Sequence, residues 1–368
     1  MIYLVPAMLF VSSILMAFAV VTNLIGGWLG AKLGLNRTMN IGLALQIVAL
    51  AMLLVPTQML TVAWVMSAQA LSGIAKDLNK MSAKSSVKLL IPDTQQGRLF
   101  TWVAALTGSK NALKGIGFFL GGALLAWIGF ANAITVMMIS LTVVWVFSMM
   151  NLRKDLGRTK ADPKFSQLFS KSGPINALSA ARMMLFGARD IWFVVALPVY
   201  FSSELGWAHS TTGAFFAVWI IAYGLVQSIT PKLFDLTGDR VPVGKDLVFW
   251  VAILTAITTG ITGIFFLQIA LPISLIAGLL VFGTVFAINS ALHSYLIVSY
   301  ASTEQVSMDV GFYYMANAMG RLIGTVLSGY IYQQSGLLAC LAGSCVMLLS
   351  SLVMSQTLPG KQKEPVNF

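Results

Sequence analysis

Long apolar runs separated by short polar stretches repeat along the whole chain. Runs of 18 or more residues are long enough to cross a hydrocarbon core of about 30 Å as helices. Glycine and proline punctuate the gaps between them, for example at Pro56, Gly129 and Gly336. The pattern predicts an all-α integral membrane protein. Eleven helices are expected at about residues 4–31, 38–56, 60–80, 98–128, 131–151, 176–203, 210–234, 246–268, 272–300, 305–333 and 336–357.

The polar gaps alternate in charge. Every second gap carries Lys or Arg, except that one gap of this set, near Glu304 and Asp309, is acidic instead, and the gaps between them carry neither. Because cytoplasmic loops are enriched in Lys and Arg, the basic gaps are expected inside the cell. The N-terminus is then outside and the C-terminus cytoplasmic, in a multi-pass membrane protein. The basic gaps lie near residues 32–37, 84–98, 153–171, 232–245 and 361–363.

The longest basic gap divides the chain into two halves. We expect an N-terminal half of five helices at 1–151, a cytoplasmic linker at 152–175, a C-terminal half of six helices at 176–357 and a cytoplasmic tail at 358–368. Transporters built from two six-helix halves carry such a linker at their middle. The sequence therefore looks like a two-half transporter bundle without its first helix. A shortened sequence and a true eleven-helix protein both remain open.

Composition supports the membrane class and excludes others. Hydrophobic residues make up 58% of the chain and charged residues 10%, against about 25% charged in soluble domains. The net charge of +11 is scattered between apolar runs, so no nucleic-acid partner is expected. Cys340 and Cys345 are the only cysteines, and their spacing puts them on different helix faces. No nucleophile–base pair, phosphate-binding glycine loop or metal-ligand cluster is evident, so we expect neither an enzyme nor a metal or cofactor.

Charged residues inside the apolar segments are the strongest functional signal. Each costs roughly 2.5–3.5 kcal/mol near the bilayer centre on an insertion scale. An excess of one sign at that depth indicates a negatively charged solute. The basic residues are Lys76, Lys80, Lys110, Lys114, Arg182, Arg189 and Arg321, and the acidic ones are Asp77 and Asp190.

Spacing along the helices predicts which of these charges share a face. Lys110 and Lys114 are one turn apart and far from both helix ends, so they need water, a counter-charge or an anionic ligand. Arg182 and Arg189, seven residues apart, also share a face. Arg321 is equally deep, and arginine suits bidentate recognition of phosphate or arsenate oxygens.

A second basic stripe runs from Lys76 at four-residue spacing. Asp77 is expected to pair with Lys80, one step of three residues along the helix. Lys76 either lines the transport path or extends toward the membrane surface. Lys84 and Lys88 are expected to be solvated at the cytoplasmic mouth. Asp190 can pair with its neighbour Arg189 or across helices.

Several segments resemble a known family. Residues 27–34 read Gly-Trp-Leu-Gly-Ala-Lys-Leu-Gly and precede Arg37, which resembles the inner-loop signature of the major facilitator superfamily, with Ala31 where that signature usually has Asp. Together with residues 21–30, 73–78 and 108–115, the chain resembles the organoarsenical efflux permeases of arsenic-resistance operons (the ArsJ type) over roughly residues 20–355.

This resemblance implies a monomeric secondary-active transporter that exports 1-arseno-3-phosphoglycerate and confers arsenate resistance. Its functional partner would be the glyceraldehyde-3-phosphate dehydrogenase that makes this ester from arsenate. On this hypothesis Asp77 and Asp190 balance charge or exchange protons. The anion would be bound by Lys110, Lys114, Arg189 and Arg321, with Lys76 and Arg182 nearby.

Two alternatives to arsenical export are open. An organophosphate, phosphate or other organic-anion transporter would need the same cations at the same depth. A chain without its first helix could also be a non-functional remnant that transports nothing.

Overall fold

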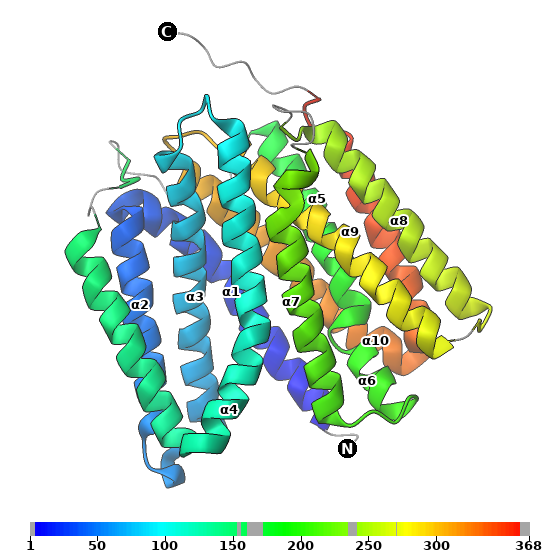
Figure 1. Cartoon of the computed structure of the whole chain (residues 1–368), viewed down its shortest axis with the longest axis horizontal. Helices are drawn as coiled ribbons and strands as arrows, with labels where there is room; N and C mark the ends of the chain where they lie inside the picture. The colour runs from blue at the N-terminus through cyan, green and yellow to red at the C-terminus, as the bar shows by residue number, and fades with distance from the viewer. Residues whose placement is uncertain (1–3, 153–155, 160–171, 235–240, 270, 361–368) are drawn as a thin grey trace.

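The computed structural model describes residues 4–152, 156–159, 172–234, 241–269 and 271–360, and side chains within these ranges from residue 18 onward. Regular structure in these ranges is helical throughout (Figure 1). Most of the linker expected at 152–175 and of the tail expected at 358–368 lies outside the described residues. The helices are α1 (Leu4–Leu33), α2 (Leu35–Ala51), η1 (Met52–Leu54), η2 (Thr57–Met59), α3 (Val62–Leu90), α4 (Gln96–Asn151), α5 (Gly173–Phe193), α6 (Ala196–Ser203), α7 (His209–Phe234), α8 (Gly244–Phe266), α9 (Leu271–Tyr300) and α10 (Val306–Ser355).

Two of these helices each contain a pair of expected spans. α4 turns sharply at Gly129 (φ 75°, ψ 172°) and α10 at Gly336 (φ 72°, ψ −171°). A positive φ favours glycine because a Cβ atom would be strained there. With α4 and α10 divided at these glycines and α5–α6 counted as one span, the described chain contains the eleven expected segments. Within the described residues, seven helical segments are long and apolar enough to cross a membrane, α4 and α10 among them.

The span expected at 176–203 is interrupted between α5 and α6. Pro198 explains the break, since a proline ring clashes with the carbonyl four residues earlier, here Val194. The free N–H of Ala196 donates a hydrogen bond to Ser328 Oγ at 3.1 Å. The backbone donor released by the break is therefore satisfied by the neighbouring helix.

The prediction that Lys84 and Lys88 are solvated was wrong. α3 continues to Leu90, ten residues beyond its expected end, and carries both lysines into the interior. Lys88 is 6% exposed and forms an ion pair with Asp93 at 2.5 Å. Lys84 is 2% exposed and lies beneath an aromatic ring. The four-residue spacing that begins at Lys76 keeps both side chains on the inward stripe.

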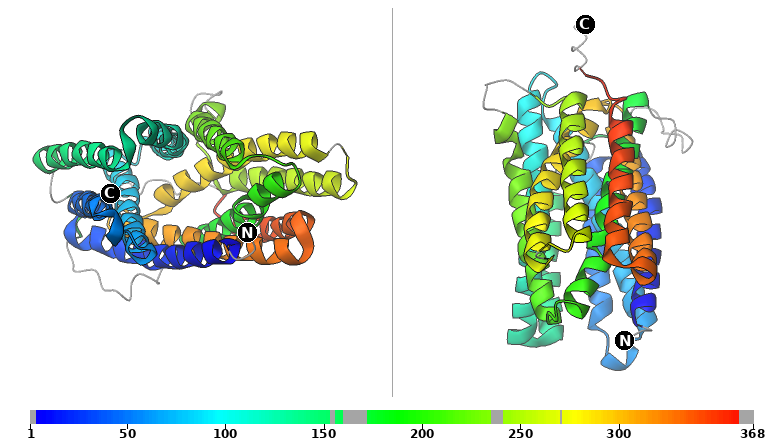
Figure 2. Two further views of the ribbon diagram at one scale, coloured as in Figure 1. Left: turned by 90° about the horizontal axis from the view of Figure 1, so that it is seen from below. Right: turned by 90° about the vertical axis from the view of Figure 1, so that its right-hand side faces the viewer.

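The chain forms two groups of helices, α1–α4 and α5–α10, which face each other (Figure 2, left). α1 packs along α10, and α4 packs along α7. Both crossings depend on glycine: a Cβ added to Gly311 would lie 2.8 Å from Gly27 Cα, and one added to Gly224 would overlap the backbone of Ala112. Small residues of this kind let membrane helices approach closely.

The two groups are sealed together at one end, where the described helices carry Lys32, Arg37, Arg98, Lys232 and Lys245 at their termini. We call this the basic end. One hydrophobic core there draws side chains from both groups, whereas the second large core belongs to α5–α10.

An aromatic contact closes the seal at the basic end. The Phe100 ring centroid lies 5.0 Å from that of Tyr295 and 5.8 Å from that of Phe234. Tyr295 Oη also donates a hydrogen bond to Gln96 Oε1 at 3.0 Å. Because Phe100 and Gln96 lie on α4, these contacts join the two groups of helices.

Candidate functional site

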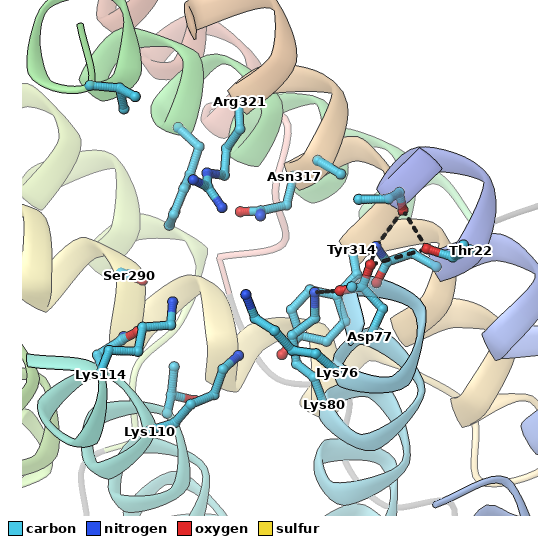
Figure 3. Close-up of a pocket in the computed structure, with 18 of the residues that line it drawn as sticks. Thr22, Lys76, Asp77, Lys80, Lys110, Lys114, Ser290, Tyr314, Asn317 and Arg321 are labelled. Atoms are coloured by element: carbon cyan, nitrogen blue, oxygen red, sulfur yellow. Dashed lines mark hydrogen bonds and ion pairs between the residues drawn. The ribbon is translucent and has the colours of Figure 1, made fainter. Parts of the chain in front are cut away.

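A cavity of about 510 Å³ lies between the two groups of helices, beyond this seal (Figure 3). Helices α1, α3 and α4 line it on one side, and α5, α7, α9 and α10 on the other. Lys110 and Lys114 lie 14 and 18 residues from the start of α4 at Gln96, which is about 21 and 27 Å along a helix. The cavity is therefore near the middle of the bundle.

Eight basic side chains line this cavity, and they divide by type between its two walls. The wall formed by α3 and α4 carries only lysines, and the wall formed by α5 and α10 carries only arginines. We call these the lysine face and the arginine face. The lysine face consists of Lys76, Lys80, Lys84, Lys110 and Lys114, and the arginine face of Arg182, Arg189 and Arg321.

The structure thus brings every predicted basic site residue to one cavity. Asp77 also lines it, while Asp190 lies fully buried behind the arginines. Lys84 is the residue that sequence reasoning placed elsewhere. The signal that could have found it is its spacing of four from Lys80, which is the same as the spacing of Lys80 from Lys76.

Three lysines of the lysine face project into the open space. The ammonium groups of Lys76, Lys110 and Lys114 point toward one another across the cavity (Figure 3). Within the described residues, none of the three has an ion-pair or hydrogen-bond partner. A group of unpaired cations at this depth repels itself and favours a bound anion.

Lys80 differs from these three because it is paired as expected. Its Nζ lies 2.9 Å from Asp77 Oδ1, and 4.1 Å from the centre of the Tyr314 ring. The other carboxylate oxygen of Asp77 accepts hydrogen bonds from Thr22 Oγ1 and Asn23 Nδ2, both at 3.1 Å. Asp77 is thus fixed by α1 and α3 together.

On the arginine face, Asp190 holds two arginines at once. Arg189 donates from Nε to Asp190 Oδ1 at 2.6 Å, and Arg321 donates from Nε to Asp190 Oδ2 at 2.9 Å. The Asp190 side chain is 0% exposed, whereas that of Arg321 is 37% exposed. Both pairings considered from the sequence are therefore present, and the carboxylate bridges α5 to α10.

Arg182 is held by neutral groups. Its Nε donates to Asn317 Oδ1 at 2.9 Å and its Nη1 to Ser290 Oγ at 3.2 Å. The guanidinium carbon lies 3.8 Å from the centre of the Phe186 ring. Stacking of this kind and a fork of hydrogen bonds suit arginine and fix its position.

A row of amide side chains connects this arginine to the lysine face. Gln227 Nε2 donates to Ser290 Oγ at 3.0 Å, and Asn111 Nδ2 donates to Gln227 Oε1 at 2.7 Å. Asn111 lies directly after Lys110 on α4. The row therefore crosses from one group of helices to the other at the level of the cavity.

The chemistry of the cavity suits an anion. Apart from the Asp77 carboxylate, its polar lining consists of ammonium and guanidinium groups with amides and hydroxyls, which supply hydrogen-bond donors for oxyanions. Among the described residues, no three His, Cys, Asp or Glu side chains come together as metal ligands.

Comparison with known proteins gives the family and the fold. The model of the major facilitator superfamily matches residues 5–244 and again residues 178–367. No curated protein matches the chain. Solved structures show the same fold. The human organic anion transporter MFSD10 (TETRAN) has a TM-score of 0.75 at 17% identity, covering 94% of this chain and 83% of that one.

Two bacterial structures are also similar. A bacterial homologue of the iron transporter ferroportin in the outward-facing state has a TM-score of 0.71 at 15% identity, over 96% of this chain and 92% of that one. The E. coli fucose:proton symporter FucP has a TM-score of 0.68 at 12% identity, over 96% and 98%. At such identities the similarity shows a shared fold.

Proposed function

The chain belongs to the major facilitator superfamily of multi-pass membrane transporters, and from this we propose that it moves a small organic anion through the central cavity. The observation that carries the proposal is the set of three unpaired ammonium groups, of Lys76, Lys110 and Lys114, in one cavity. Cations without a protein partner at this depth require an exchangeable counter-ion. A transported anion supplies one.

The transport mechanism that fits this arrangement is rocking of the two groups of helices about the cavity. With the basic end in the cytoplasm, as the charge of the loops indicates, the seal at Phe100 and Tyr295 closes the inner side. The cavity then faces outward, and the C-terminus is cytoplasmic. Asp77 and Asp190 keep part of the positive charge balanced when no anion is bound, and are the candidates for proton coupling.

For the substrate, we propose the organoarsenical anion 1-arseno-3-phosphoglycerate, exported by a monomer in a bacterial inner membrane. The sequence resemblance at residues 73–78 and 108–115 supports this substrate. The resemblance also makes a glyceraldehyde-3-phosphate dehydrogenase its functional partner. An ester with an arsenate and a phosphate group also suits a cavity with cations on two opposite walls.

A second candidate is an organophosphate anion such as phosphoglycerate. The same lysines and arginines would bind it, and the similar human structure is that of an organic anion transporter. Both candidate substrates are small organic molecules that carry a tetrahedral oxyanion group. They differ in whether arsenate is needed to form the transported anion.

Export from cells tests both candidates. Arsenic-sensitive bacteria expressing the chain and the dehydrogenase, together or singly, are challenged with arsenate, and retained arsenic is measured. We expect retention to fall when both proteins are present, and Lys110→Ala to abolish the fall. Lys232→Ala is the matched control, because Lys232 is an exposed lysine at the end of α7 and lies outside the cavity.

The outcomes separate the hypotheses. Exchange of phosphoglycerate without arsenate, with no effect on arsenic, would identify the organophosphate transporter. Full export by the Lys110→Ala variant would show that the lysine face does not bind the transported anion. No transport of either anion would contradict the proposed function and agree with a non-functional remnant.

A further inference from the structure

Lys84, at the end of the lysine face nearest the basic end, has surroundings unlike those of the other lysines. It is 2% exposed, and its Nζ has no hydrogen-bond partner in the part of the chain that the structure describes. Its nearest charge-stabilising contacts are aromatic: Nζ lies 5.0 Å from the centre of the Tyr314 ring and 5.9 Å from that of Tyr313. Lys84 therefore carries a buried ammonium at the closed edge of the cavity, which it lines with very little of its surface.

Two other buried polar groups near Lys84 have no partner beyond each other. The hydroxyls of Tyr313 and Ser294 face one another, and neither has a further hydrogen-bond partner in the described residues. The Tyr313 ring centre lies 5.9 Å from Lys84 Nζ and 5.3 Å from the Arg182 guanidinium carbon. Buried polar groups are normally satisfied, so each exception needs a reason. Two hydroxyls and an ammonium together form a set of hydrogen-bond donors suited to an oxyanion.

The position of these groups in the fold supplies the reason. Lys84 lies one turn beyond Lys80 toward the basic end, and Ser294 precedes Tyr295, whose ring closes the seal against Phe100. The groups thus lie at the edge of the cavity that is next to the seal. Rocking of the two groups of helices opens this region and closes the other side.

We propose that Lys84, with Tyr313 and Ser294, forms an inner anion subsite that is closed toward the basic end in the outward-facing state. When the seal at the basic end opens, the subsite binds the oxyanion group of the substrate next to the lysines of the central cavity. This inference rests on the proposed function, and it adds a second place along the path where the same class of anion is held. Lys84 then governs movement between the cavity and the inner side.

Chemical labelling tests whether the subsite opens. In a chain with Cys340→Ser and Cys345→Ser, the variant Lys84→Cys is exposed in membrane vesicles to an anionic methanethiosulfonate, added on the basic side or on the opposite side. We expect labelling from the basic side. Ser85→Cys is the control, because Ser85 is the next residue on the same helix and is 0% exposed. Labelling of Lys84→Cys no faster than Ser85→Cys, or only from the opposite side, would overturn the proposal.

Separate measurements of binding and transport distinguish this inference from the proposed function. Binding and transport of labelled phosphoglycerate and of the arsenate ester are measured with purified, reconstituted protein. We expect Lys84→Met to keep binding within about twofold and to lose transport at least tenfold. Lys84→Arg is expected to restore part of the transport. Lys88→Met is the matched control, since Lys88 is similarly buried but paired with Asp93.

Each result has one meaning. Normal transport by Lys84→Met overturns the inner subsite and leaves the proposed function intact. Loss of binding in Lys84→Met, as expected for Lys110→Ala, would place Lys84 in the central site and also overturn it. Absence of binding and transport in the unaltered chain would contradict the proposed function itself.

Discussion

The lysine face and the arginine face line the same cavity, but their charges have different partners. Arg189 and Arg321 share the carboxylate of Asp190, and Arg182 is held by Asn317 and Ser290. On the opposite wall, Lys80 is paired with Asp77, and the other lysines have no acidic partner in the described chain. Protein groups therefore hold every arginine in place, although one carboxylate offsets only one of the three charges, whereas four of the five lysines are left for a ligand.

This difference follows from the side chains themselves. A guanidinium is planar and offers several donors in a fixed fork, so protein acceptors can hold it in one place. An ammonium is a compact charge on a flexible stem, and it can move to follow an anion. We infer that the arginine face is mainly a scaffold and that the three unpaired lysines of the lysine face, Lys76, Lys110 and Lys114, make the exchangeable contacts.

Removing Asp190 should have the largest effect and should act on stability. Asp190→Asn leaves Arg189 and Arg321 without their shared counter-charge. Breaking a buried ion pair by removing one partner costs about 3–5 kcal/mol. We expect a clear fall in Tm in detergent and lower yield of folded protein, measured by thermal unfolding.

Asp77→Asn is the comparison for that experiment. Asp77 holds one lysine where Asp190 holds two arginines, and Lys80 also contacts the Tyr314 ring. We expect a smaller fall in Tm than for Asp190→Asn. Equal falls would show that the two walls are stabilised in the same way, against the distinction drawn above.

Much of this arrangement could be predicted from the sequence. Apolar length placed the eleven segments, because a bilayer fixes how long a crossing helix must be. The depth of Lys110 and Lys114 in α4, and of Arg321 in α10, made them site candidates. The Lys80–Asp77 pair followed from a spacing of three residues on one helix.

Contacts between helices could not be predicted in the same way. Asp190 bridges α5 and α10 because Gly187 and Gly320 bring their backbones together, which no spacing on one helix reveals. Lys84 was misplaced because the polar sequence after Lys80 is typical of a solvated helix end. Burial of Lys84 involves Tyr313 and Tyr314, more than 200 positions later in the chain.

Neutralising the lysine face should affect binding and leave stability intact. We expect Lys114→Met and Lys110→Met each to weaken anion binding at least tenfold, because each removes a charge that only the ligand compensates. Tm should stay the same or rise, since the remaining lysines repel one another less. Binding is measured by titration of purified protein with labelled phosphoglycerate and with the arsenate ester, and Tm on the same samples.

A matched arginine variant sharpens this test. Lys114→Arg keeps the charge and should retain most of the binding. A fall in Tm for Lys114→Met as large as that for Asp190→Asn would mean that the lysine face is structural. The assignment of the exchangeable contacts to that face would then be wrong.

The smallest effect is expected where the two faces are joined. Asn111→Ala removes the hydrogen bond to Gln227, and a single buried hydrogen bond contributes about 1 kcal/mol. Gln227 keeps its bond to Ser290, so the arginine face should stay in place. We expect anion binding within about twofold of the unaltered chain, and a transport rate changed by no more than about fivefold, which corresponds to about 1 kcal/mol.

A double-mutant cycle shows whether the row of amides carries more than this. Asn111→Ala, Gln227→Ala and the double variant are compared for Tm and transport. If the contact acts alone, the coupling between the two positions should be about 1 kcal/mol, and binding should be unaffected in all three. If Asn111→Ala instead weakens binding as strongly as Lys110→Met, the lysines depend on the arginine face for their position. The two walls would then act as one site, because the row of hydrogen bonds that links Arg182 to Asn111 through Ser290 and Gln227 would set where the ammonium groups lie.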